Sequence, residues 1–347
     1  MNQIHGESVT FQNVEKYYDQ TAAVKNFNLE IRNSEFLTLL GPSGSGKTTV
    51  LNMIAGFIQQ TSGSILIGKN SIENLPTEKR NVGMVFQSYS LFPHMNIFDN
   101  VAFPLKMRNE NKNKVIENVR YALKLVNLEG VEKRMPNELS GGQRQRIAFA
   151  RAIVFKPKVL LMDEPLGALD LKLREKMQIE IKNYHKEINC TILYVTHDQG
   201  EALALSDRIV IMNKGKIVQI DDPKNIYDNP ISKFAANFIG ETNILNIDKL
   251  NIDKKNLLLE NKEFLSIRPE KLKLIDEKFI KNENQVLLNL KINQIIFLGD
   301  IIKYICNDDD HNTIILKKTR IDNEANFNIS DTIRVYFNIY DCTLLKE

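Results

Sequence analysis

The sequence predicts an α/β domain over its first two-thirds, followed by a smaller, mostly β domain. In the first part, apolar runs of strand length alternate with longer segments of helical periodicity. Past Gly240, apolar and polar residues instead alternate with period two, as in 288–293 and 333–339. A chain of 347 residues is long enough for two domains, and we expect them to span 1–239 and 240–347.

Composition and charge narrow the class of protein. The chain is 43% hydrophobic and 26% charged, as in an ordinary globular protein. Its net charge of +3 and its lack of Lys/Arg blocks predict no nucleic-acid partner. The three cysteines, Cys190, Cys306 and Cys342, are far apart and odd in number, which indicates reduced thiols in a cytosolic protein. No uncharged apolar run approaches the roughly 20 residues of a membrane-spanning helix, so we expect a soluble chain that works at a membrane only through other subunits.

Two alternating runs, 9–14 and 24–31, are expected to form the opening strands, and 64–68 a later one. Between the first two lie Tyr17 and Tyr18. An aromatic ring at this place can stack on a nucleotide base, because π-faces attract one another in offset geometry. Packing at the edge of a sheet explains the two tyrosines equally well, so both interpretations stay open here.

Residues 41–48, GPSGSGKT, fit the phosphate-loop pattern G-x-x-x-x-G-K-[ST] at every fixed position. An apolar strand is expected before them at 35–40, and a helix after them over 49–55. The glycines allow backbone N–H groups to point at an anion, and the helix start adds its positive dipole end. We expect Lys47 to reach the β and γ phosphates and Thr48 to bind Mg²⁺. A chance glycine turn would account for the glycines but not for this lysine, this threonine and both flanks.

The next apolar run, 81–87, is expected to be a strand that ends in Gln87. The following segment, 88–95, is apolar for a loop, and it either lies beneath a partner or packs locally. From 96 to 135 the pattern is helical, and Pro104 is expected to break its first part.

A second helix start suited to an anion follows at 139–146, LSGGQRQR. Ser140 can cap the helix, while Gly141 and Gly142 allow another backbone to come close. Since the chain already has one phosphate loop, this second start is suited to a nucleotide held by another copy.

Two adjacent carboxylates, Asp163 and Glu164, follow the apolar strand 158–162. Ligands bind at the carboxyl ends of strands in parallel sheets, so this position is informative. One acid can hold Mg²⁺ while its neighbour orients the attacking water. The strand 191–196 likewise ends at His197; a lone histidine is more often structural, but this position favours a functional one.

Together these motifs resemble the ATP-binding cassette family over roughly the first two-thirds of the chain. Residues 41–48 look like Walker A, and 159–164 look like Walker B with its catalytic glutamate. Residues 139–143 match the family signature LSGGQ at every position. Gln87 and His197 fall where the family has its Q-loop glutamine and switch histidine. The remaining matches are 168–170 with the D-loop and Tyr18 with the aromatic that stacks on adenine.

The resemblance implies a P-loop NTPase cassette with a helical subdomain, and two cassettes that close head to tail around two ATP molecules. It implies nucleotide contacts from Tyr18, Gly41, Pro42, Ser43, Gly44, Ser45, Gly46, Lys47, Thr48, Thr49, Ser140, Gly141, Gly142 and Gln143. The implied catalytic residues are Glu164, His197, Lys47 and Gln87, and the implied Mg²⁺ contacts are Thr48, Gln87 and Asp163.

The C-terminal part resembles the small OB-like β-barrel (TOBE-like) domain of bacterial importers, through 266–270 and 299–304. Residues 237–243 are similar to the junction in polyamine-type importer ATPases, although iron(III), phosphonate, sulfate and sugar importers share much of this layout. The resemblance thus implies an importer ATPase at the cytoplasmic face of the cell membrane. Its implied partners are an identical second cassette, two transmembrane permease subunits and, indirectly, an extracytoplasmic solute-binding protein. The C-terminal domain is expected to be regulatory.

Two other classes remain for comparison. Soluble ABC ATPases that act on ribosomes or DNA usually carry two cassettes, or a long coiled-coil insertion, and neither feature is present in this sequence. A nucleotide-binding regulator without turnover is disfavoured by the intact Glu164 and His197.

Overall fold

The computed structural model describes residues 5–250, 263–275, 279–320 and 327–345. The chain divides into two compact units, Met1–Pro223 and Lys224–Glu347. Helices α7 (Pro223–Asp228) and α8 (Lys233–Phe238) lie almost wholly in the second unit. The functional limits 1–239 and 240–347 stay a prediction. Among the described residues, no helix combines the length and apolar character that crossing a bilayer requires.

A six-stranded sheet is the centre of the first unit, with strand order β10-β9-β3-β8-β7-β6. All neighbours in it pair in parallel except β10, which is antiparallel to β9. Four of its five parallel strands, β3, β6, β7 and β8, were predicted from continuous apolar runs, which are typical of strands buried on both faces. The bounds are β3 Phe36–Leu40, β6 Val82–Val85, β7 Val159–Asp163, β8 Thr191–Thr196, β9 Arg208–Asn213 and β10 Lys216–Asp221.

One face of this sheet is covered by helix α1 (Lys47–Ala55) and a four-stranded antiparallel sheet of order β2-β1-β4-β5. The bounds of that second sheet are β1 Val9–Tyr18, β2 Thr21–Ile31, β4 Ser62–Ile67 and β5 Asn70–Ser71. In the core between them, Phe11 and Phe27 meet edge to face with ring centroids 5.1 Å apart. Val159 and Leu161 point into this core from β7.

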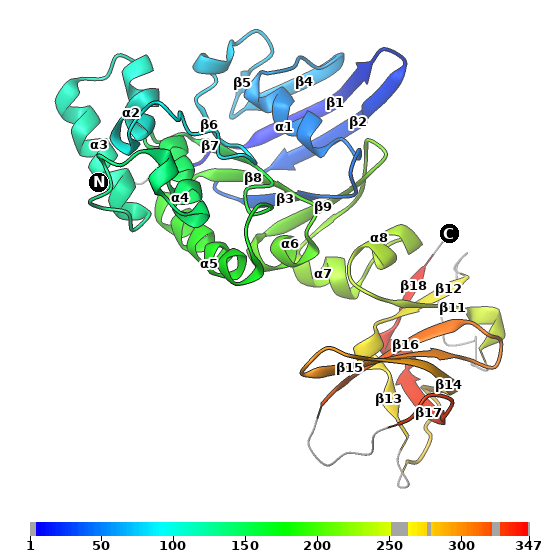
Figure 1. Ribbon diagram of the computed structural model, residues 1–347. Helices are drawn as coiled ribbons and strands as arrows, with labels where there is room; N and C mark the ends of the chain where they lie inside the picture. Colours follow the sequence, from blue (N-terminus) through cyan, green and yellow to red (C-terminus); the bar gives the residue numbers. More distant parts are fainter. Residues whose placement is uncertain (1–4, 251–262, 276–278, 321–326, 346–347) are drawn as a thin grey trace. The chain divides into compact units, whose positions relative to one another are not determined.

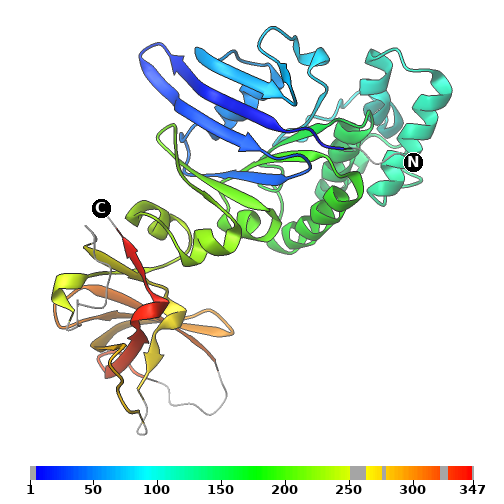
Figure 2. The ribbon, with the colours of Figure 1, turned by 180° about the vertical axis from the view of Figure 1, so that it is seen from behind.

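The other face of the central sheet packs on helices (Figures 1 and 2). Leu160 and Met162 belong to this second core. They alternate along β7 with Val159 and Leu161, so they point to the opposite face of the sheet. The helices that contribute to this core are α2 Ile97–Met107, α3 Lys112–Leu125, α4 Gly141–Ile153, α5 Leu171–Ile188 and α6 Gln199–Leu205. Because α1 and α4 contribute to different cores, they cover opposite faces of the sheet.

Pro104 does not break the first helix where the sequence predicted a break. It lies inside α2, which continues to Met107. Leu105, directly after the proline, is 2% exposed and belongs to the helix-side core. We attribute the continued helix to this packing, which overrides the local preference of proline.

Apart from its helices, the described part of the second unit forms two antiparallel sheets, in agreement with the predicted β domain. Their orders are β11-β12-β18 and β13-β17-β14-β15-β16. Leu265 and Ile267 from the first sheet share one core with Leu290 and Phe337 from the second. The bounds are β11 Asn243–Asn246, β12 Phe264–Ile267, β13 Lys273–Leu274, β14 Gln285–Phe297, β15 Ile301–Asn307, β16 Thr313–Thr319, β17 Thr332–Asn338 and β18 Thr343–Leu345.

Candidate active site

The sequence-predicted residues gather at the carboxyl ends of four neighbouring parallel strands. The phosphate loop follows β3, His197 follows β8, Glu164 follows β7, and Gln87 comes two residues after β6. Because β8 lies between β3 and β7, and β6 flanks β7, these strand ends form one continuous edge. This edge is where open parallel sheets bind ligands.

The phosphate loop owes its shape to its glycines. Gly44 and Gly46 have φ values of 77° and 100°, a region that disfavours residues with a Cβ. A Cβ on Gly46 would also lie 2.5 Å from the carbonyl oxygen of Ala23. Helix α1 starts directly after Gly46 with no side-chain cap, so its first N–H groups remain available to an anion.

Lys47 is held over the loop that precedes it. Its ammonium donates to the carbonyl oxygens of Gly41 at 2.8 Å and Pro42 at 3.0 Å. The side chain is buried, and burial lowers the pKa of Lys47, while the charges of Glu164 and Asp163 act in the opposite direction. An ammonium group held against the phosphate loop is well placed to bind a phosphate group.

Thr48 and Asp163 meet across the site. The Thr48 hydroxyl donates to the Asp163 carboxylate, with Oγ1 and Oδ1 3.3 Å apart. Burial raises the pKa of Asp163, and the hydrogen bond from Thr48 opposes that rise. A hydroxyl and one carboxylate fit Mg²⁺, which is usually held by one or two protein oxygens together with phosphates and water. Among the residues that the structure describes, no cluster of three or more His, Cys, Asp or Glu side chains offers a metal cage.

Glu164 brings the remaining predicted catalytic residues together. The Gln87 amide donates to its Oε2 at 3.3 Å, and His197 Nδ1 lies 3.2 Å from the same oxygen. The backbone of Glu164 is left-handed, with φ at 43°. Its N–H donates to Val195 on β8 at 2.9 Å, and its carbonyl accepts from Gly167 at 3.1 Å, so the unusual conformation is fixed on both sides.

Helix α4 starts where the sequence predicted, and Ser140 caps it. Ser140 is the N-cap of α4 and makes a capping box, in which its Oγ accepts from the Gln143 N–H at 3.3 Å. The Gln143 side chain accepts in turn from the Ser140 N–H at 2.9 Å. A Cβ on Gly142 would lie 3.0 Å from Leu173 on α5, so a larger residue would press on that helix. This helix start belongs to the opposite face of the sheet from α1.

Tyr18 lies at the end of β1 with its side chain 47% exposed. The Lys16 ammonium lies 5.1 Å from its ring centroid. Tyr17, beside it, is 39% exposed, and its N–H donates to Thr61 at 3.0 Å. Neither ring is buried by packing at the edge of a sheet. The exposed ring of Tyr18 is therefore accessible to a nucleotide base.

A buried network next to His197 was missed by sequence reasoning. Glu201 is 2% exposed and accepts hydrogen bonds of 2.8 Å from the hydroxyls of Tyr194 and Thr196. Burial raises the pKa of Glu201. Nearby, Arg174 on α5 pairs with Asp198 at 3.0 Å. The signal available in the sequence was three hydroxyl side chains, those of Thr191, Tyr194 and Thr196, in an otherwise apolar strand, since buried hydroxyls need partners.

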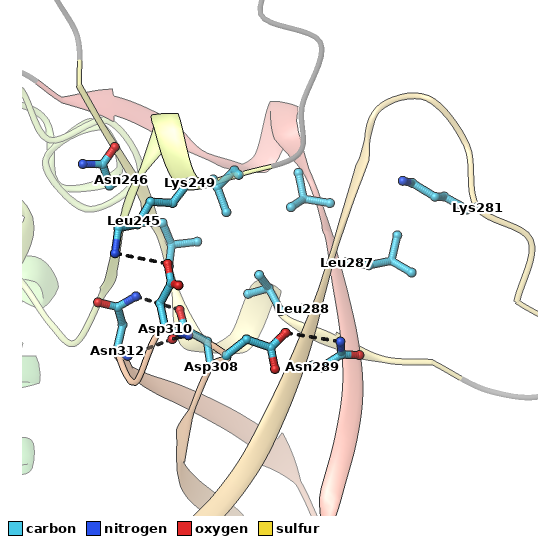
Figure 3. A pocket seen from close by; sticks show the side chains of 13 residues that line it. Leu245, Asn246, Lys249, Lys281, Leu287, Leu288, Asn289, Asp308, Asp310 and Asn312 are labelled. Carbon is cyan, nitrogen blue, oxygen red and sulfur yellow. Dashed lines mark hydrogen bonds and ion pairs between the residues drawn. The ribbon is translucent and has the colours of Figure 1, made fainter.

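The second unit has a cavity of its own, of about 280 Å³, drawn in Figure 3. Leu245 and Leu288 line it together with a rim of acidic and amide side chains. These acids are already paired: Asp310 with Lys249 at 3.1 Å, and Asp308 with Asn312 at 2.9 Å. We find no catalytic arrangement among the residues that line it.

The fold and the site define the class of ATP-binding cassettes, in which a phosphate loop, a Walker B acid pair and a signature helix occur in one domain. Residues 24–167 match the family model described as ABC transporter, and residues 265–345 match the TOBE domain model. This chain belongs to the ABC transporter family and is an ABC-type ATPase.

Three curated relatives support the assignment over most of the chain. A "Spermidine/putrescine import ATP-binding protein" of Acetivibrio thermocellus is 42% identical, covering 98% of this chain and 96% of its own. The protein of the same name from Clostridioides difficile is 50% identical, covering 80% and 77%. The one from Thermotoga maritima is 40% identical, covering 88% of each chain.

Solved structures agree with the cassette part. A dimeric ATP-binding cassette in a post-hydrolysis state, bound to ADP and Pi, matches with a TM-score of 0.56 and 34% identity. The match covers 62% of this chain and 98% of that one. A cassette from Clostridium perfringens that is part of an ABC transporter complex matches with a TM-score of 0.59 and 27% identity, covering 65% and 91%.

Proposed function

We propose that this chain is the ATP-hydrolysing subunit of a polyamine importer for spermidine or putrescine. The observation that carries the proposal is Glu164, whose Oε2 lies within 3.3 Å of both Gln87 Nε2 and His197 Nδ1, at the mouth of a complete phosphate loop. The names of relatives that match 80–98% of the chain support the polyamine substrate. Importers of iron(III), phosphonate, sulfate or sugars remain the alternative within the same class.

The phosphate loop binds the nucleotide. Residues 41–49 surround the phosphates, with backbone N–H groups donated by residues other than Pro42. Lys47 exchanges its two carbonyl partners for the β and γ phosphate oxygens. Thr48 and Asp163 would hold Mg²⁺ through the oxygens that share a hydrogen bond in this structure, with Gln87 as a further contact. The ion would supply charge neutralisation at the β and γ phosphates. Tyr18 stacks on the adenine.

Hydrolysis is completed by the residues at the ends of β7, β8 and β6. Glu164 accepts a proton from the attacking water as its oxygen bonds to the γ phosphorus, while the bond from that phosphorus to the β–γ bridging oxygen breaks and ADP leaves. Gln87 orients the water through the same carboxylate that it already contacts. His197 stabilises the charge that develops on the γ-phosphate oxygens. Each of these side chains acts by position and charge, since phosphoryl transfer asks little covalent chemistry of the protein.

The signature residues serve a second, identical copy. Ser140, Gly141, Gly142 and Gln143 start a helix on the face of the sheet opposite α1. In a head-to-tail dimer they would contact the γ phosphate held by the partner's phosphate loop. A similar solved cassette, which is a dimer bound to ADP and Pi, supports this arrangement. Closure of the dimer then completes two sites at once.

We further propose that the dimer works at the cytoplasmic face of the cell membrane, bound to two transmembrane permease subunits. A solute-binding protein outside the membrane would signal through these permeases. The cassette domain would span 1–239, and the β domain 240–347 would restrain the ATPase in response to a ligand or partner.

ATPase activity of the full chain, purified with its permeases and reconstituted in liposomes, tests the proposal. We expect turnover to rise when a binding protein loaded with spermidine or putrescine is added. Stimulation by a binding protein for another solute would reassign the substrate. Turnover indifferent to every binding protein, with no co-purifying permease, would indicate a soluble ABC ATPase instead.

A further inference from the structure

The loop that carries Gln87 contains two consecutive residues in an unfavourable backbone conformation. Tyr89 and Ser90 have φ values of 61° and 45°, in the left-handed region that non-glycine residues usually avoid. Such conformations persist only where the surroundings enforce them, and they cluster at functional sites. The Tyr89 side chain is anchored, since it is 7% exposed and belongs to the helix-side core.

Arg151, near the end of the signature helix α4, is the group that enforces this conformation. Its guanidinium donates to the carbonyl oxygen of Ser90 at 2.7 Å and to that of Tyr89 at 2.9 Å. The side chain is 8% exposed, and its guanidinium lies 5.5 Å from the ring centroid of Phe92 in the same loop. The carbonyls of two successive left-handed residues thus converge on one planar donor, which matches the fork geometry of arginine.

Burial of the Arg151 guanidinium carries a desolvation cost, because the charged group is removed from water. Desolvation lowers the pKa of Arg151 to about 10, so the guanidinium remains charged at neutral pH. A buried charge needs close partners, and the two loop carbonyls provide them. If the loop changed conformation, the buried Arg151 guanidinium would lose its hydrogen-bond acceptors. If the guanidinium were removed, nothing would hold the two carbonyl groups in the loop together.

We propose that Arg151 is a positioning residue for ATP hydrolysis, holding the strained Tyr89–Ser90 turn so that Gln87 reaches Glu164. This inference rests on the proposed role of Gln87. Arg151 touches neither the phosphate loop nor Glu164 and acts only through the turn. It lies 11 positions after Ser140 on one helix, about 16 Å along its axis. Helix α4 thereby connects the residues that meet the partner's nucleotide with the glutamine of the chain's own site.

Two substitutions test the role in the full chain. Arg151→Gln removes the charge and one side of the fork, and we expect kcat for ATP to fall about tenfold, because a small misplacement of a catalytic group is costly. The KM for ATP should change by less than about twofold, since the phosphate loop is untouched. Arg151→Lys keeps the charge and can still reach one carbonyl, so it should recover part of the lost kcat.

Arg80 offers a matched control. It is also 8% exposed, and its guanidinium donates to backbone carbonyls at Leu75, Met53 and Ile54 rather than in the Gln87 loop. Arg80→Gln should lower thermal stability like Arg151→Gln but leave kcat of the folded protein within about twofold. Equal losses of kcat in both variants would show a general stability effect and overturn the proposal.

A double-mutant cycle separates action through Gln87 from any other effect. In a Gln87→Ala background, Arg151→Gln should alter kcat by less than about twofold, because the residue that it positions is gone. Full additivity of the two losses would overturn the inference.

Hydrogen exchange without nucleotide gives a readout that does not depend on turnover. The Tyr89 amide, now bonded to the Phe86 carbonyl at 2.9 Å, should exchange faster in Arg151→Gln than in wild type. Unchanged exchange at this amide would overturn the inference even if kcat fell. Absence of any turnover in the wild type would instead reject the proposed function and leave this loop measurement standing.

Discussion

Glu164→Gln is the sharpest test of the active site. The replacement has nearly the same shape, and its carbonyl oxygen can still accept from Gln87 Nε2, now 3.3 Å from Glu164 Oε2. It loses only the charge and the ability to take a proton. Removing a general base typically slows a reaction by about 10²- to 10⁴-fold, which corresponds to about 2.7–5.4 kcal/mol of transition-state stabilisation.

Nucleotide binding should survive the same change. The loop that holds the phosphates is built from other residues. The Glu164 carboxylate near Lys47 repels a bound triphosphate, and the substitution removes that repulsion. We therefore expect ATP affinity to be unchanged or higher, and the ATP-bound dimer to persist. Steady-state phosphate release and equilibrium titration with a fluorescent ATP analogue measure the two effects separately.

Glu175→Gln is the control, because Glu175 is an exposed acid on helix α5. It removes the same charge outside the site and should leave kcat unchanged. A Glu164→Gln protein that hydrolyses ATP within about threefold of wild type would refute the assignment of Glu164 as the base.

Three further predictions address nucleotide affinity, pH and thiol reactivity. Tyr18→Ala should weaken ATP binding about 5- to 150-fold with a smaller effect on kcat, because aromatic stacking on a base is worth about 1–3 kcal/mol. Unchanged affinity in a binding titration would reject the stacking role. Burial raises the pKa of Glu201, so the folded state holds its proton more tightly than the unfolded state, and stability is lost as pH rises from the ordinary carboxyl range through the folded-state pKa. Denaturant midpoints of Glu201→Gln should lack that loss, and an identical pH dependence in both proteins would contradict it. Burial raises the pKa of Cys190 to about 12 and that of Cys306 to about 11. A thiol reagent at pH 8 should therefore label neither cysteine until the protein is unfolded. Rapid labelling of either thiol in the native protein would contradict their burial.

The sequence predicted the strand ends well because their chemistry is local. Apolar runs such as 158–162 read as buried strands, and the residues directly after them are the ones that parallel sheets present to ligands. The capping box at Ser140 was predictable for the same reason, since a cap and its partner lie within one helical turn.

The rest depends on contacts between residues far apart in the chain. Pro104 stays helical because its neighbours pack on a core that no local pattern reveals. The left-handed turn at Tyr89 and Ser90 contains no glycine that would have predicted it from the sequence. The side chain that holds this turn belongs to Arg151, 61 positions after Ser90. Such geometry follows from tertiary packing and is therefore absent from sequence periodicity.

The order of strands in the central sheet also sets when the active site can form during protein synthesis. Strand β3, which leads into the phosphate loop, pairs with β8 and β9, whose residues begin at Thr191 and Arg208. A ribosome adds about 5–20 residues per second, so β3 waits on the order of 10–30 seconds for both neighbours. Throughout that time an apolar strand and a glycine-rich loop lack the sheet that supports them. A nascent chain therefore cannot gain stability from ATP binding until almost the whole cassette has been synthesised.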